Sequence, residues 1–198
     1  MHHRIGGLLI VAGSAGFGLL LILGLAGATI GTADNLVTAF LLFASAASAG
    51  FGTGLLAIDG SELSEGGAVR LGLEIVAASL LGLIGAELWV IVFPIRGDPL
   101  SSPLTLVFAG SYLGLLVGQA LVGLGLVRRG GPRRITGGLV LVGFVVVVVG
   151  ASDLVVGGGD FALAVRFIGL VTLLLGWAGL GLVAVRDAQG RVPAGTGP

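Results

Sequence analysis

A long apolar segment between Arg70 and Arg96 constrains the fold of this chain more than any other stretch. It reads RLGLEIVAASLLGLIGAELWVIVFPIR, and Glu74 and Glu87 are its only charged residues between the two arginines. About 20 consecutive apolar residues are enough for an α-helix to cross the hydrocarbon core of a bilayer. The segment therefore predicts a transmembrane helix that carries two carboxyl groups.

The composition extends this prediction to the whole chain. Hydrophobic residues make up 56% of the 198 residues and charged residues only 10%. Soluble domains carry about 25% charged residues, so this chain has too few of them to cover a water-facing surface. We expect an all-α, polytopic protein whose main partner is the lipid bilayer. Because the formal net charge is zero, nucleic acid is not an expected partner.

Six segments exceed the length of about 20 apolar residues that a membrane span needs. We expect them to form one domain over residues 1–185, built from three tandem helical hairpins at about 5–57, 69–127 and 135–185. Residues 186–198 are polar and are expected to form a disordered tail. The expected helices are Ile5–Ile30, Asn35–Ala57, Val69–Ile95, Pro103–Val127, Ile135–Val156 and Phe161–Val185.

The arginines predict the orientation, because positive residues gather on the cytoplasmic side of membrane proteins. With the N-terminus inside, only Arg96 and Arg166 fall on the outer side. We therefore expect both termini in the cytoplasm. The arginines on the inner side are Arg4, Arg70, Arg128, Arg129, Arg133, Arg134, Arg186 and Arg191.

Short motifs recur at the ends of the three hairpins. The hairpins begin at Arg4, Arg70 and Arg134, which lie 66 and then 64 residues apart. This spacing indicates a tandem repeat with pseudo-threefold symmetry about the membrane normal. The alternative is chance, because glycine is so common, with 39 copies. The motifs are RIGG, RLG and RITG at the starts, and GTGL, GLGL and GLGL at the ends.

Three glycine-rich hairpins in so short a chain resemble the HdeD-like family of small six-helix membrane proteins. That resemblance implies a prokaryotic inner-membrane protein, from a family associated with acid resistance in bacteria. Family members often carry a proline where a hairpin turns, and here the middle hairpin does, with Pro94, Pro99 and Pro103. The resemblance rests on this pattern and carries over no functional residue.

Glu87 is the residue that best indicates a function. It lies nine residues before Arg96, or about 13 Å along a helix, which is too deep for a short carboxylate to reach the outer surface. A carboxylate inside a membrane costs roughly 3 kcal/mol or more, so it needs a partner, a proton or water. Ser111 and Tyr112 lie at a similar depth on the next helix and are the expected hydrogen-bond donors.

Gln119 and Ser79 extend this polar line along the same two helices. The line has two interpretations: a protonatable site in an ion or solute path, or a hydrogen-bonded carboxyl that fixes helix packing. Glu74 lies four residues after Arg70, so we expect the two to pair at the inner interface. Glu74 and Glu87 lie about 220° apart around the helix and are not a catalytic pair.

Gly110, Gly114 and Gly118 follow one another at intervals of four and share one helix face. Such a face allows another helix to approach closely. Gly50 and Gly54 form a shorter version on the second helix. These faces indicate either packing inside the monomer or an interface with a second copy or a membrane partner.

Asp153 and Arg166 flank the third outer turn at a similar depth. We expect them to form an ion pair that joins the fifth and sixth helices. Contact between Arg166 and an anion is the alternative.

Residues 157–161, GGGDF, resemble the motif of intramembrane aspartyl proteases. Those enzymes need a second aspartate facing the first. Asp59 falls on the opposite side of the membrane, and Asp153 belongs to the same tight hairpin. We therefore expect Asp160 to cap the start of the last helix.

Other chemistry has no residues to support it. The chain has no cysteine and no lysine, and its two histidines are His2 and His3. We expect no catalytic residue, cofactor or metal site. The first hypothesis is a non-enzymatic structural or accessory membrane protein that acts through helix–helix contacts. The alternative is a small proton- or ion-coupled transporter or channel that uses Glu87, and the remote alternative is an intramembrane aspartyl protease.

Overall fold

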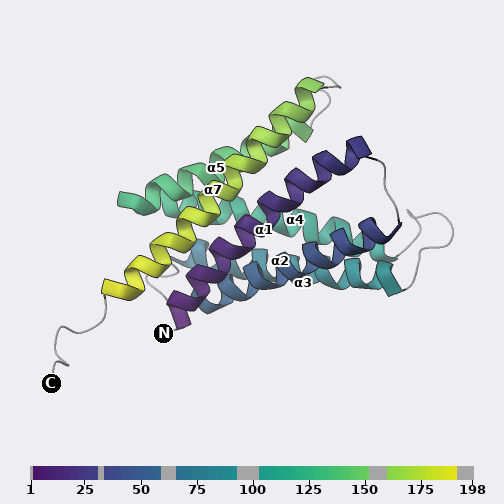
Figure 1. The fold of residues 1–198 in the computed structure, drawn as a ribbon. Coiled ribbons are helices and arrows are strands. Elements are labelled where there is room, and N and C mark those ends of the chain that lie inside the picture. Colours follow the sequence, from purple (N-terminus) through teal and green to yellow (C-terminus); the bar gives the residue numbers. More distant parts are fainter. Residues whose placement is uncertain (1, 31–33, 59–65, 93–102, 152–159, 191–198) are drawn as a thin grey trace.

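The computed structural model describes residues 2–30, 34–58, 66–92, 103–151 and 160–190. All the regular structure in these ranges is α-helical, and it forms six helices (Figure 1). The prediction of an all-α chain with six helices is confirmed. The helices are α1 (His2–Ile30), α2 (Asp34–Ile58), α3 (Gly67–Val92), α4 (Pro103–Val127), α5 (Gly131–Ala151) and α7 (Asp160–Gly190).

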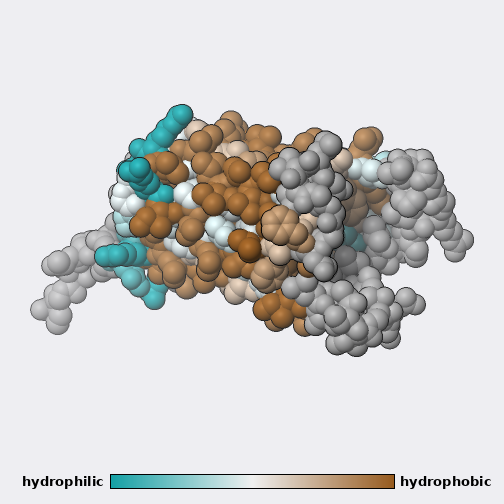
Figure 2. Space-filling model, turned by 90° about the horizontal axis from the view of Figure 1, so that it is seen from above, coloured by the Kyte–Doolittle hydropathy of each residue, from teal (hydrophilic) through white to brown (hydrophobic). Residues whose placement is uncertain are grey.

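Five of the helices are long and apolar enough, over their described residues, to cross a membrane. In α2 the corresponding apolar stretch, Leu42–Ile58, is shorter. The outer surface agrees with this assignment, since large apolar side chains point outward: Leu106 is 78% exposed and Ile135 is 69% exposed. On the face seen in Figure 2, hydrophobic residues cover most of the described surface, and the hydrophilic residues gather mainly at one end. The architecture is that of a multi-pass helical membrane protein.

The turn between α4 and α5 is tighter than the sequence predicted. Helix α5 begins at Gly131 instead of Ile135, which leaves residues 128–130 to reverse the chain. Gly130 and Gly131 have φ angles of 75° and 59°, in the left-handed region that glycine adopts without a steric cost. Pro132 then stands in the first turn of α5, where its missing N–H is not needed.

Helix α7 is longer than predicted, because it continues to Gly190 instead of ending at Val185. In this extension, Arg133 Nη2 of α5 lies 2.9 Å from Asp187 Oδ2. This ion pair joins the end of α7 to the start of α5. The first five residues of the expected tail are therefore helical, and 191–198 lie outside the described residues.

The six helices form a closed ring. Each helix packs against the one before it and the one after it along the chain, and α1 packs against α7 to close the circle. The start of α1 and the end of α7 lie at the same end of the bundle (Figure 1). We call this the arginine end, because it also holds the α4–α5 turn with Arg128 and Arg129.

Glycines bring neighbouring helices together backbone to backbone. A Cβ placed on Gly54 of α2 would lie 2.8 Å from the carbonyl oxygen of Gly6 in α1. Likewise, a Cβ on Gly118 of α4 would lie 2.8 Å from the carbonyl oxygen of Gly72 in α3. No real Cβ atom approaches a carbonyl so closely, so these positions require glycine.

Glycine contacts also join one hairpin to the next, and the closest of these among the described residues lie near the arginine end. A Cβ on Gly181 of α7 would lie 2.6 Å from the Gly7 oxygen of α1. A Cβ on Gly137 of α5 would lie 3.0 Å from the Gly123 oxygen of α4. Within each hairpin, by contrast, close glycine contacts continue toward the other end, as at Gly13 of α1. The hairpins are therefore held together most tightly at the arginine end.

A branched apolar residue fits against a glycine in each hairpin. Ile10, Val76 and Val140 lie at corresponding positions of α1, α3 and α5, and none is more than 1% exposed. Close packing of this kind stabilises helix pairs in lipid, where burial of apolar surface provides no driving force. The three residues contact, in that order, Gly54, Gly118 and Gly176.

We expect Gly118→Ala to destabilise the bundle. The new methyl group would meet Gly72 and Val76 of α3, and forced overpacking of a tight core costs about 1–3 kcal/mol. Gly110→Ala, on the same helix, is the matched control, because a Cβ there has nothing within 4 Å. It should be neutral or slightly stabilising, since alanine favours helix by up to about 1 kcal/mol over glycine. Denaturant titration in mixed micelles measures the free energy of unfolding of both variants. Equal stability of the two would contradict the close α3–α4 contact.

Candidate functional site

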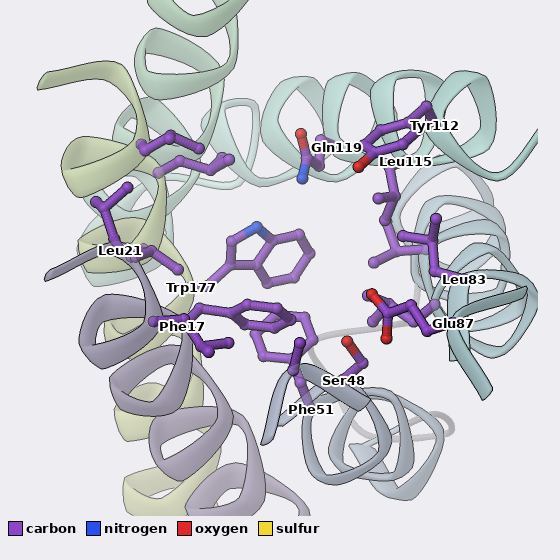
Figure 3. Close-up of a pocket in the computed structure, with 17 residues that line it drawn as sticks. Phe17, Leu21, Ser48, Phe51, Leu83, Glu87, Tyr112, Leu115, Gln119 and Trp177 are labelled. Carbon is purple, nitrogen blue, oxygen red and sulfur yellow. The ribbon is translucent and has the colours of Figure 1, made fainter. Parts of the chain in front are cut away.

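A cavity of about 580 Å³ lies inside the ring, between α1, α2, α3, α4 and α7. Its walls come from parts of the helices beyond the glycine contacts at the arginine end. Figure 3 shows the side chains that surround it. The lining residues are Phe17, Leu20, Leu21, Ala44, Ser48, Phe51, Val76, Leu80, Leu83, Glu87, Tyr112, Leu115, Gln119, Leu170, Leu173, Leu174 and Trp177.

The bundle is filled on the side of the cavity that faces the arginine end. Leu55 of α2, Val122 of α4 and Leu180 of α7 are at most 1% exposed there. They belong to the main hydrophobic core together with Leu73 and Leu126. Among the described residues, the filled part coincides with the closest glycine contacts between hairpins, and the cavity lies beyond them.

Glu87 is the acidic residue in the cavity wall. Its carboxyl oxygens point into the cavity (Figure 3), and Oε2 accepts a hydrogen bond of 2.8 Å from Ser45 Oγ of α2. The sequence predicted that Ser111 or Tyr112 of α4 would be the donor, whereas in the structure the donor is Ser45 of α2. The ring explains the difference, because α3 packs against α2 on one side and α4 on the other.

The predicted polar line divides into two groups. Glu87, Tyr112 and Gln119 line the cavity. Ser79 and Ser111 are buried between α3 and α4 instead, each facing a glycine of the opposite helix: Ser79 faces Gly114 and Ser111 faces Gly82. Ser79 Oγ also donates a hydrogen bond of 2.7 Å to its own helix, at the Ile75 carbonyl.

Glu74 lies away from the cavity. Arg70 Nε is 3.0 Å from Glu74 Oε1, and both side chains are well exposed. An exposed pair of this kind contributes at most about 1 kcal/mol. Glu74 is thus a carboxylate on the same helix as Glu87 with a different environment, which makes it a useful control.

The side chain of Arg166 contacts the backbone of α5. Its Nε donates a hydrogen bond of 2.6 Å to the Gly150 carbonyl oxygen. The predicted partner Asp153 lies outside the described residues, as does Asp59 of the protease hypothesis. Asp160 is the first residue of α7.

Of the glycines that the sequence analysis named as helix-packing residues, some contact a neighbouring helix and others do not. Gly54, Gly114 and Gly118 face the neighbouring helix of their own hairpin. At Gly50 and Gly110, a Cβ would have nothing within 4 Å. Two of the three glycines in the stripe on α4 are therefore occupied by contacts inside the monomer.

Sequence reasoning missed the wall opposite Glu87. Trp177 of α7 is only 2% exposed, and its ring lies 5.2 Å from that of Phe51 in an edge-to-face arrangement. The Phe51 ring in turn lies 6.1 Å from that of Phe17. One signal was available: Ser45, Ser48 and Phe51 recur at intervals of three, which places them on one face of α2.

The chemistry of the lining is acidic and apolar. Among the described residues that line the cavity, none is an arginine, lysine or histidine. Among the described residues, no group of three or more His, Cys, Asp or Glu side chains gathers to hold a metal ion. The described part of the wall thus offers one carboxyl group, a few neutral polar groups and a large apolar and aromatic surface.

Comparison of the chain with protein-family models, with curated proteins and with solved structures gives no match in any of the three.

We expect Ser45 and Glu87 to be energetically coupled. A hydrogen bond to a carboxyl group contributes about 0.5–3 kcal/mol, depending on its charge. A double-mutant cycle of Ser45→Ala and Glu87→Met, measured by unfolding in mixed micelles, should give a coupling above about 0.5 kcal/mol. The same cycle with Ser48→Ala is the control, since Ser48 lines the cavity as well. Equal coupling in both cycles would contradict a specific bond from Ser45.

Proposed function

We propose that this chain is a non-enzymatic, multi-pass membrane protein that takes a small solute into the intramembrane cavity. It acts as a small proton- or cation-coupled transporter, and Glu87 is the group that contacts the proton or the solute. The bilayer is the prokaryotic inner membrane, as expected from the sequence.

One observation carries the proposal: a carboxyl group faces a cavity of about 580 Å³ inside an apolar helix bundle. Acidic residues in membrane helices are costly and typically mark solute or proton pathways. Small-molecule sites are usually apolar cavities of about 300–1,000 Å³ with a few placed polar groups. Glu87 and its cavity fit both descriptions.

The accessory role through helix contacts receives less support. It relied on the glycine stripe of α4 as a face for a partner. Gly114 and Gly118 instead contact α3, which leaves only Gly110 of that stripe open. A transporter therefore accounts for more of the described features than a docking protein does.

A transporter also fits better than a continuous channel. The core toward the arginine end is filled by residues such as Leu55 and Val122, both fully buried. A solute in the cavity would need a second conformation to pass this layer. Alternating access of helix groups around a central site is the usual solution in transporters.

We expect Glu87→Gln to abolish proton or cation flux into proteoliposomes, because it removes the titratable carboxyl group from the cavity. Glu74→Gln is the matched control: it removes an exposed carboxylate of the same helix and should keep full flux. Flux in neither the wild type nor the variants would reject transport.

Filling the cavity provides a second test that leaves Glu87 in place. Ala44 lines the cavity and is 8% exposed, so Ala44→Phe should reduce flux at least several-fold. Ala46, two residues along α2, is exposed on the outer surface, and Ala46→Phe should transport normally. Equal flux through both variants would show that the cavity is not the path.

We also propose that the arginine end faces the cytoplasm, on the basis of its basic residues. The chain has no cysteine, so an introduced one is a unique label. We expect Arg128→Cys in the α4–α5 turn to be protected from a membrane-impermeant maleimide in intact cells and labelled after lysis. Labelling in intact cells would reverse the orientation.

A tandem repeat is the remaining proposal. Ile10, Val76 and Val140 each lie six residues after the arginine that begins their hairpin. Each of them is buried against a glycine of the following helix. This recurrence at equal spacing supports three related hairpins better than chance matches of common residues do.

A further inference from the structure

The two sides of the cavity differ in chemistry, and this difference specifies a ligand. The Glu87 carboxyl group stands on one side and the Trp177 indole on the other, with Phe51 between them along the wall (Figure 3). The neutral polar groups of Tyr112 and Gln119 come from α4. The choice of ligand rests on the proposed function, because it assumes that the cavity receives a solute.

Charge decides the first property of that solute. With Glu87 in the wall and no basic side chain among the lining residues that the structure describes, an anion would meet repulsion and find no partner there. A cation would find a carboxylate, in a medium where a charge pair is much stronger than in water. Trp177 and Phe51 add to this preference, because aromatic faces attract cations, with tryptophan the strongest.

Size and apolarity decide the second property. A bare metal ion would need several ligands to replace its water, and the lining, where it is described, offers a single carboxyl group. Most of the wall consists of leucine and aromatic side chains, such as Leu83 and Leu115, which favour contact with an apolar body. The volume of about 580 Å³ is that of a site for a small organic molecule, not for an ion alone.

We infer that the cavity binds lipophilic organic cations, with the positive charge at Glu87 and the apolar body against Phe51 and Trp177. Such molecules dissolve in the bilayer, so they reach a site inside the membrane through the lipid. The Ser45 hydroxyl orients the carboxyl group toward them, since it donates to Oε2 and leaves Oε1 for the ligand.

Trp177 makes the inference measurable. The chain has two tryptophans, and Trp89 is 53% exposed on the outside of α3. In a Trp89→Phe background, Trp177 is therefore the only tryptophan and reports on the cavity by its fluorescence. The probes are tetraphenylphosphonium and tetraphenylborate, which have nearly the same shape and opposite charge.

We expect tetraphenylphosphonium to change the Trp177 fluorescence saturably and tetraphenylborate to give no saturable change. Glu87→Gln should weaken phosphonium binding about tenfold or more, the effect of losing a charge pair of about 1.4 kcal/mol. Glu74→Gln should leave the affinity unchanged. Phe51→Leu should weaken binding a few-fold, because it removes one aromatic face and keeps an apolar side chain.

The outcomes separate this inference from the proposed function. Equal binding of the two probes, or phosphonium binding unaffected by Glu87→Gln, would overturn the preference for cations and leave transport through the cavity standing. A copurified lipid that occupies the cavity and is not displaced by phosphonium would also overturn it. If neither probe binds and the proteoliposomes show no flux, both the ligand class and the transporter fail together. If Glu87→Gln does not fold, the difference in binding between the two probes on the wild type still tests the preference for cations.

Discussion

The fold depends on the close approach of helix backbones at glycine. In lipid, apolar side chains gain little by leaving their surroundings, so helices associate through tight packing. Gly6 against Gly54, and Gly72 against Gly118, are the clearest examples, because even one methyl group would collide with a carbonyl there. Among the described residues, the closest glycine contacts between hairpins lie near the arginine end, and the cavity lies beyond them.

Glu87 gains its importance from that uneven packing. A carboxyl group on a uniformly packed helix would serve only to hold a neighbour, as the bond from Ser45 does here. Because the bundle leaves a cavity beyond the filled core, the same group also faces open space and an aromatic wall. The structural and the functional interpretation of Glu87 are therefore compatible: one oxygen is held by α2, and the other remains available to the cavity.

The number and places of the helices could be predicted, because length and apolarity alone decide whether a segment can cross a bilayer. The depth of Glu87 also followed from counting along a helix. The hydrogen-bond donor to Glu87 could not be predicted, because hydropathy does not show which neighbouring helix a given helix face contacts. Counting placed Ser111 level with Glu87 on α4, whereas the donor is Ser45 on α2. Trp177 was missed for a similar reason, since only the closing contact between α1 and α7 brings the last helix to the cavity.

That closing contact has a consequence for biogenesis. Helices leave the ribosome in order, and α1 must wait until the four helices between have been made before its second neighbour, α7, exists. Until then the inserted helices form an open arc, with the Gly7 surface of α1 and the future cavity facing lipid. Insertion of α7 supplies the Gly181 contact and the Trp177 wall in one event. Completion of the cavity is thus a late step of synthesis, and a chain released before α7 would lack the α7 wall of the cavity.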